Sequence, residues 1–137
     1  MKKKLNCILL IDDNPDDNFF HERIIGKSLC AEKVIAIESA IEALDFLKNV
    51  DPKEIPQLIL LDINMPGMNG WEFLAEYSRL DKERRSCIVV VLLTTSHNPD
   101  DEQLARTYDI VCDFKIKPLT EPILRSILRD HFSDYLL

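Results

Sequence analysis

Two kinds of segment alternate along the 137-residue chain, and this alternation restricts the fold more than any other feature of the sequence. Short apolar runs recur between longer segments whose apolar residues have helical spacing. Most of the runs are continuously apolar, which is typical of strands covered on both faces of a parallel sheet. The five expected strands are Cys7–Ile11, Val34–Ile37, Leu58–Leu61, Cys87–Leu93 and Ile110–Phe114.

The segments between these runs begin with residues that cap helices. Side chains of asparagine, serine and threonine accept hydrogen bonds from the free N–H groups of a helix start, and acidic residues in the first turn favour the same end. Ser39 and Glu42 also have the spacing of a capping box. The expected caps are Asn14, Ser39, Asn69, Asn98 and Thr120.

The resulting order, a strand followed by a helix five times over, predicts an α/β fold. Strands and helices that alternate in this way form a parallel sheet with helices on both faces and right-handed crossovers. With 46% apolar and 30% charged residues, a chain of this length can form one packed core. We expect a single domain over residues 1–137, with no effector domain.

The composition excludes several classes of protein. The net charge of −7 disfavours nucleic-acid binding and binding to anionic membranes, both of which need a basic face. The apolar run behind the lysine-rich start is too short for an export signal or a membrane span. Scattered cysteines without a CxxC pair predict buried, reduced thiols in a cytoplasmic protein. They are Cys7, Cys30, Cys87 and Cys112.

Polar residues follow the expected strands, and in a parallel sheet the ends of the strands share one edge, where ligands bind. Three carboxylates gathered there would repel one another, by about 4 kcal/mol for two charges about 4 Å apart at an effective dielectric near 20. A divalent cation and a nearby lysine would relieve that repulsion. In strand order, the residues at these ends are Asp12, Asp13, Asp62, Thr94 and Lys117.

This set of residues predicts phosphoryl transfer assisted by Mg²⁺. Hard carboxylate oxygens suit Mg²⁺, which combines one or two protein carboxylates with waters and a phosphate oxygen. An aspartate can be the covalent nucleophile, while the metal and the lysine neutralise the transferring group. Taken singly, each residue also has an ordinary explanation as a turn aspartate, a satisfied threonine or a surface lysine. Their convergence on one edge favours the site.

Four stretches of the chain resemble the receiver domain of two-component response regulators, over roughly residues 5–132. The resemblance implies a flavodoxin-like fold, a five-stranded parallel sheet in the order 2-1-3-4-5 with helices on both faces. The segment Asp12-Asp-Asn-Pro-Asp-Asp17 is similar to the single-domain branch that includes phytochrome-associated regulators. The four stretches are Ile8-Leu-Leu-Ile-Asp-Asp13, Leu60-Leu-Asp-Ile-Asn-Met-Pro-Gly-Met-Asn-Gly70, Leu93-Thr-Thr95 and Lys115-Ile-Lys-Pro-Leu119.

The resemblance implies a role for each residue at the strand ends. Asp62 would accept a phosphoryl group from a sensor histidine kinase or a histidine phosphotransfer protein. Asp13, Asp62 and the backbone carbonyl of Asn64 would bind Mg²⁺ as the cofactor, and Asp12 would act mainly through water. Lys117 would contact the phosphoryl oxygens. The domain would catalyse only its own phosphorylation and dephosphorylation, so we do not expect an enzyme that acts on other substrates.

The resemblance also implies a switch. Thr94 would turn its hydroxyl towards the phosphate and Phe114 would move inward, which converts a local charge change into a surface change. Ordinary core packing is the alternative reading of Phe114. The Lys117–Pro118 peptide would be cis, and the bulk of Thr95 would narrow access to the site. The positions that tune self-dephosphorylation in relatives are here Asn64 and Ser96.

Output would come from contact with another protein, since we expect no effector domain after the last helix. The family's usual contact face would be formed by residues 99–132, and the partner would be an unknown downstream protein or a second copy in a homodimer. Tyr135, Leu136 and Leu137 would extend such an interface or form a frayed end. The phosphoryl group could also be passed onward.

Four alternatives use the same residues. A haloacid dehalogenase-type phosphohydrolase needs an aspartate where Asn64 stands, and a calcium loop needs glycine and glutamate where Asp17 and Arg23 stand. A flavodoxin would need a phosphate-cradling loop after the first strand, which here is acidic. The alternative that stays open is a pseudo-receiver, an interaction module that keeps the fold without using phosphorylation.

Overall fold

A single five-stranded parallel sheet in the order β2-β1-β3-β4-β5 organises the molecule, as the computed structural model shows over residues 4–85, 88–95 and 98–132. The predicted fold class and strand order are therefore confirmed. Cys87, Ser96 and the segment 135–137, to which the sequence analysis gave roles, lie outside the described residues. The strands are β1 (Leu5–Ile11), β2 (Ala31–Ile37), β3 (Leu58–Leu61), β4 (Val89–Thr94) and β5 (Val111–Ile116).

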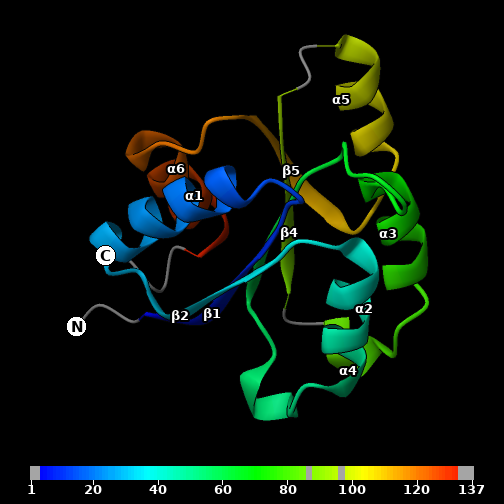
Figure 1. Cartoon of the computed structure of the whole chain (residues 1–137), viewed down its shortest axis with the longest axis horizontal. Helices are drawn as coiled ribbons and strands as arrows, with labels where there is room; N and C mark the ends of the chain where they lie inside the picture. The colour runs from blue at the N-terminus through cyan, green and yellow to red at the C-terminus, as the bar shows by residue number, and fades with distance from the viewer. Residues whose placement is uncertain (1–3, 86–87, 96–97, 133–137) are drawn as a thin grey trace.

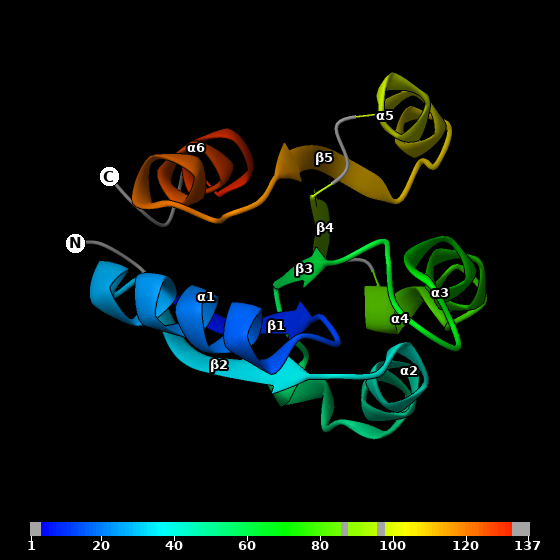
Figure 2. The same ribbon diagram turned by 45° about the horizontal axis from the view of Figure 1, so that its top comes forward.

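Helices cover both faces of the sheet (Figures 1 and 2). The helices α1 and α6 lie side by side on one face, and α2, α3 and α5 lie on the other. Two short elements, η1 and α4, precede β3 and β4; they span too few residues to show helical periodicity, and the sequence did not predict them. The bounds are α1 (Pro15–Ser28), α2 (Ala40–Asn49), η1 (Pro52–Glu54), α3 (Gly70–Tyr77), α4 (Lys82–Arg85), α5 (Pro99–Arg106) and α6 (Glu121–His131).

The sheet separates two hydrophobic cores, and this explains why its three central strands are largely apolar on both faces. Leu9 and Ile11 of β1 belong to the core beneath α2 and α3, whereas Ile8 and Leu10 belong to the core beneath α1 and α6. Alternate side chains of a strand point to opposite faces, so a central strand is apolar at each position that is covered, on either side.

Four strands extend beyond or shift from their predicted limits. The backbone ladder between β1 and β2 begins at the pair Leu5 and Ala31, and β5 continues past Phe114 until Ile116 pairs with Thr94. Hydrogen bonds between backbones do not depend on side-chain polarity, so an apolar pattern alone marks the ends of strands imprecisely. The bounds of β3 agree with the prediction.

All five predicted helix caps form. Asn14, for example, accepts hydrogen bonds from the N–H groups of Asp16 and Asp17. The reciprocal capping box that was predicted at Ser39 is instead found at Asn69, where the Glu72 side chain accepts the second bond. Among the described residues, Ser39 makes only the first of the two bonds.

Free thiols are found at Cys7, Cys30 and Cys112, and the expectation of burial is wrong for Cys112. The register between β4 and β5 shifts at this point, because Val90 faces Val111 and Val91 faces Asp113. The bulge leaves Cys112 without a partner position on β4, and its side chain lies at the surface. No described helix is long and apolar enough to cross a membrane.

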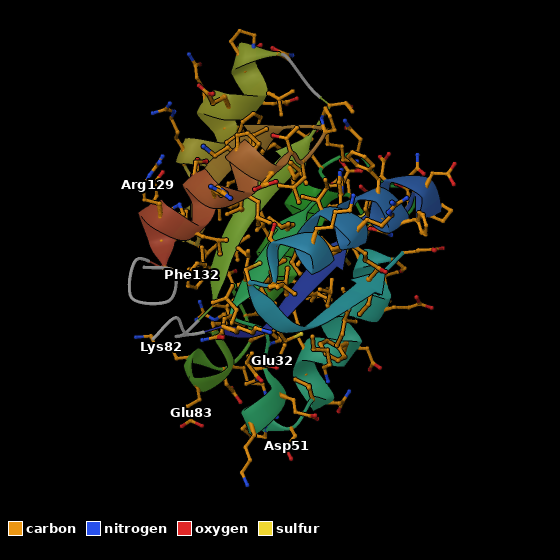
Figure 3. The ribbon with its side chains drawn as sticks, turned by 90° about the vertical axis from the view of Figure 1, so that its left-hand side faces the viewer. Glu32, Asp51, Lys82, Glu83, Arg129 and Phe132 are labelled. Carbon is orange, nitrogen blue, oxygen red and sulfur yellow. The ribbon has the colours of Figure 1, made fainter. Side chains whose placement is uncertain are left out.

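Exposed charges of both signs are spread over the end of the sheet at which the strands begin. Figure 3 shows Glu32, Asp51, Lys82 and Glu83 at this end of the molecule. The opposite end, where the strands finish, carries the concentrated acidic cluster that is described next.

Candidate functional site

Three aspartates from two adjacent strands meet at the end of the sheet. Asp12 and Asp13 follow β1, Asp62 follows β3, and each offers a carboxylate oxygen within 4.8 Å of the others. Asp12 and Asp62 are buried, with exposed fractions of 4% and 6%, while Asp13 is half-buried. The structure thus brings together the three carboxylates that sequence reasoning placed at one edge.

The ladder between strands holds these aspartates at the edge of the sheet. The N–H of Asp12 donates to Ile37 O at 3.2 Å, and the N–H of Asp62 donates to Ile11 O at 2.9 Å. Both carboxylates then accept a hydrogen bond from the chain that follows them, Asp12 from Asn14 N at 3.0 Å and Asp62 from Asn64 N at 3.4 Å. Backbone bonds on both sides of each aspartate therefore fix where its carboxylate can lie.

The start of α3 packs closely against the backbone of Asp62 and Ile63, at the end of β3. Gly70 N donates to Ile63 O at 2.8 Å, and a Cβ atom at Gly70 would lie 2.7 Å from Ile63 Cα and 2.8 Å from Asp62 O. Only glycine fits at this contact without moving the backbone beside Asp62. Gly67, in the same loop, has a φ of +74°, in the left-handed region that favours glycine.

Lys117 is the cation of the site. It follows β5, its side chain is 8% exposed, and its Nζ lies 2.5 Å from Asp12, 2.9 Å from Asp17 and 3.7 Å from Asp62. The Lys117 N–H donates to Thr94 O at 2.7 Å, which ties the lysine to the end of β4. The Lys117–Pro118 peptide is cis, as predicted.

Opposing effects determine the pKa of Asp62. Burial, reinforced by the charges of Asp12 and Asp13, raises the pKa of Asp62 to about 6, although Lys117 and the Asn64 N–H pull it down. For Lys117, burial lowers the pKa, but hydrogen bonds to Asp12 and Asp17 outweigh it, and the pKa is raised. Because the pKa of Asp62 is about 6, its carboxylate is mostly ionised at neutral pH, beside the ammonium group of Lys117.

We expect the affinity for Mg²⁺ to fall as the pH decreases through about 6, because a proton then competes with the cation for Asp62. Well below that pH the dissociation constant should rise about tenfold per pH unit, if one proton is displaced per ion bound. Calorimetric titration between pH 5 and pH 8 would measure it, with an Asp62→Asn variant as the control without this titration. A wild-type affinity that stays constant across this range would contradict the expectation.

The structure also places Thr94, Phe114 and Asn64, to which the sequence analysis assigned roles. Thr94 is fully buried at the end of β4, whereas Asn64 is exposed in the loop after Asp62. Phe114 pairs with Leu92 and is half-buried against the core beneath α2 and α3. It is therefore the diagonal neighbour of Thr94 on the same face of the sheet, where two side chains can contact each other. Thr95 is exposed.

Three further residues of α1 take part in the site, and sequence reasoning did not identify them as such. Asp17 was considered only as a helix-start acid, as part of the family-like segment and in the argument against a calcium loop, but it binds Lys117. Asn18 and His21 are buried, at 4% and 2% exposure, and contact the loops that carry Asp12 and Lys117. The available signal was the presence of polar residues three apart on the face of a helix that must cover the sheet.

Comparisons with known proteins agree with this geometry. A model of the response regulator receiver domain matches residues 8–129. The chain is 37% identical over 97 residues to Response regulator Rcp1 of Synechocystis sp., and the match covers 69% of this chain and 65% of that protein. The chain thus spans slightly less than two thirds of the length of this curated relative.

Solved structures are similar over nearly the whole chain. A two component response regulator from Cytophaga hutchinsonii is 30% identical, with a TM-score of 0.84 and coverage of 96% of this chain and 99% of that chain. The bacteriophytochrome response regulator AtBRR is also 30% identical, with a TM-score of 0.76 and coverage of 98% and 96%. The second similarity agrees with the phytochrome-associated branch indicated by the sequence.

Proposed function

This chain belongs to the response regulator receiver domain family, and from that premise we propose that Asp62 accepts a phosphoryl group from a phosphohistidine. Receiver domains work in two-component signalling with sensor histidine kinases, so the donor is such a kinase or a histidine phosphotransfer protein. The observation that supports the proposal is the buried Asp62 carboxylate, which lies in one cluster with two other aspartates and a lysine.

In the proposed reaction the carboxylate of Asp62 attacks the phosphorus atom. A new O–P bond forms, the N–P bond of the phosphohistidine breaks, and the imidazole nitrogen leaves with the electron pair. Lys117, whose Nζ lies 3.7 Å from Asp62, stabilises the charge on the transferred group. The carboxylate must be ionised to attack, and the pKa of Asp62, raised to about 6, allows this at neutral pH.

The three aspartates fit Mg²⁺ as the cofactor. Carboxylate oxygens are the ligands this ion prefers, and their mutual repulsion is what a divalent cation would relieve. Asp13, Asp62 and the backbone carbonyl of Asn64 would hold the ion, with Asp12 acting mainly through water. When bound, Mg²⁺ neutralises charge on the carboxylates and on the phosphoryl oxygens.

The same proposal gives the domain an output that depends on phosphorylation. Thr94 would turn its hydroxyl to the phosphoryl group and Phe114 would move inward, altering the surface formed by α5, β5 and α6. The domain would then bind a downstream protein, form a homodimer or pass the phosphoryl group on. Phe114 is half-buried, so an inward movement would reduce the exposed part of its side chain.

An Asp13→Asn variant should bind Mg²⁺ about tenfold to a hundredfold more weakly than the wild type, because the site loses a charged ligand. Calorimetric titration at pH 8 would measure the change. Asp109→Asn, at an exposed position after α5, is the matched control and should keep the wild-type affinity. An Asp13→Asn variant with wild-type affinity would remove Asp13 from the ligand set.

Incubation with a small phosphodonor such as acetyl phosphate, with and without Mg²⁺, tests the function directly. We expect a phosphate adduct that forms only with Mg²⁺, is labile to hydroxylamine and maps to Asp62 by mass spectrometry. A pseudo-receiver would form no such adduct. Absence of labelling in the wild type, under conditions that label a known receiver domain, would establish that alternative.

A further inference from the structure

Two polar side chains on the inner face of α1 have no part in the proposed reaction. Asn18 and His21 are 4% and 2% exposed, and their spacing of three places them on the same side of the helix. The rest of this face packs into the core beneath α1 and α6, to which Ile25 belongs. Burying a polar group costs free energy unless the group forms hydrogen bonds. The hydrogen bonds of Asn18 and His21 therefore indicate what these two side chains contribute.

Each of the two side chains binds the backbone of a different loop at the site. Asn18 Nδ2 donates to Asp12 O at 2.8 Å, in the loop after β1. His21 Nε2 accepts a bond from Leu119 N at 3.4 Å, in the loop after β5. These loops carry Asp12 and Lys117, whose carboxylate and ammonium groups form the ion pair of the site.

The bond from His21 matters because of where it lies in the segment that carries the lysine. Lys117 N donates to Thr94 O at 2.7 Å, Pro118 has no N–H, and Leu119 N donates to His21. The backbone donors of this three-residue segment are therefore anchored at both ends. Removing the His21 acceptor would release one end and leave the N–H of the fully buried Leu119 unpaired.

Asn18 provides a second, independent observation. Its Oδ1 is buried and has no hydrogen-bond partner among the residues that the structure describes. An unpaired buried acceptor lowers stability, so stability alone does not explain an asparagine here. What the asparagine side chain does provide is the hydrogen bond from its Nδ2 to Asp12 O.

We propose that Asn18 and His21 are positioning residues. Their hydrogen bonds to the loops after β1 and β5, made from one face of α1, keep Lys117 Nζ close to the Asp12 and Asp62 carboxylates. Lys117 in turn acts on the transferred group, so the effect on phosphorylation rests on the proposed function. The hydrogen bonds from one face of α1 to both loops are present in the structure whether or not Asp62 accepts a phosphoryl group.

The test compares His21→Leu and His21→Gln in the wild-type and Lys117→Met backgrounds, with acetyl phosphate and Mg²⁺. His21→Leu should slow phosphorylation about tenfold to a hundredfold, since misplacement of a reacting group by about 1 Å has effects of that size. His21→Gln offers an amide oxygen as the acceptor and should recover most of the rate. In the Lys117→Met background, His21→Leu should change the rate less than about twofold.

A matched control separates positioning from general loosening of α1. Ile25→Ala removes a buried side chain of the same helix face and should lower stability while leaving the phosphorylation rate within about twofold of the wild type. An equal loss of rate from His21→Leu with and without Lys117 would overturn the proposal. So would a His21→Gln variant no faster than His21→Leu. If His21→Leu does not fold, Asn18→Ala takes its place in the same comparison.

Failure of the proposed function and failure of the positioning role can be told apart even if the wild type takes up no phosphoryl group. That result would refute the proposed function, and the positioning role would then be read from urea unfolding of the single and double variants. His21→Leu and Lys117→Met should be non-additive by at least about fivefold in the unfolding equilibrium constant, because the two residues share one segment. Additive effects would refute the positioning role as well.

Discussion

An Asp62→Asn variant should form no hydroxylamine-labile phosphate adduct with acetyl phosphate and Mg²⁺, under conditions that label the wild type. The amide is a poor in-line nucleophile, so the loss should be complete within detection. Intact-protein mass spectrometry measures it, and the isosteric change keeps the packing around a side chain that is 7% exposed.

The same substitution should stabilise the metal-free protein at pH 8. The pKa of Asp62 is raised to about 6, mainly by burial, from an ordinary value of 3.8, so the folded state binds this proton more tightly than the unfolded state does. The contribution of Asp62 to the free energy of unfolding therefore falls as the pH rises from about 4 to about 6. The uncharged amide of the Asp62→Asn variant should restore on the order of 1–3 kcal/mol above pH 6.

Urea unfolding at pH 4 and pH 8, in the presence of a chelator, tests the stability effect. The difference between Asp62→Asn and the wild type should be small at pH 4 and should favour the variant at pH 8. Asp51→Asn, at an exposed position, is the control for removal of a surface carboxylate. Persistent labelling of Asp62→Asn on another residue, or a lower stability at pH 8, would contradict the assignment.

A Lys117→Met variant should be strongly destabilised when Mg²⁺ is absent. The ammonium group of Lys117 contacts Asp12, Asp17 and Asp62, two of which are buried, and methionine keeps most of the volume but not the charge. Leaving buried carboxylates without their cation costs about 3–5 kcal/mol. Urea unfolding at pH 8 with a chelator would measure the loss.

Added Mg²⁺ should recover much of that stability, since the cation takes over part of the neutralisation and binds at least as tightly as in the wild type. Lys115→Met is the matched control, because Lys115 is paired with Asp113 at 3.6 Å outside the acidic cluster. Its effect should stay within about 0.5 kcal/mol. Wild-type stability of Lys117→Met in the absence of metal would show that the lysine does not neutralise the site.

The acidic cluster could be predicted without coordinates because it depends on topology. Continuous apolar runs identify covered parallel strands, and parallel strands deliver the residues at their ends to one edge of the sheet. Asp13 and Asp62 are far apart in the sequence, yet the order of strand types already placed them together. Helix starts were equally accessible, because caps such as Asn14 and Thr120 act on N–H groups a few residues away.

The sequence placed Lys117 at the same edge as the aspartates, but which carboxylates it binds could not be predicted in the same way. Its bond to Asp17 joins the loop after β5 to the first turn of α1, and its bond to Asp12 joins two loops of the sheet edge. Such contacts depend on how α1 packs over the sheet. The pattern of apolar residues indicates that α1 covers the sheet, but it does not indicate which side chains meet. The exposure of Cys112 has a similar cause, because the bulge in β5 depends on the register with β4.

The sequence by itself determined the fold class, the helix starts and the gathering of aspartates at one sheet edge, because each follows from local hydrogen bonding or from the period of apolar residues. Only the tertiary structure decided which of these carboxylates are buried, how Lys117 is shared among them, and how Asn18 and His21 anchor the two loops. The physical reason is that burial and charge pairing depend on distances between segments remote in the chain, and those distances are set by packing.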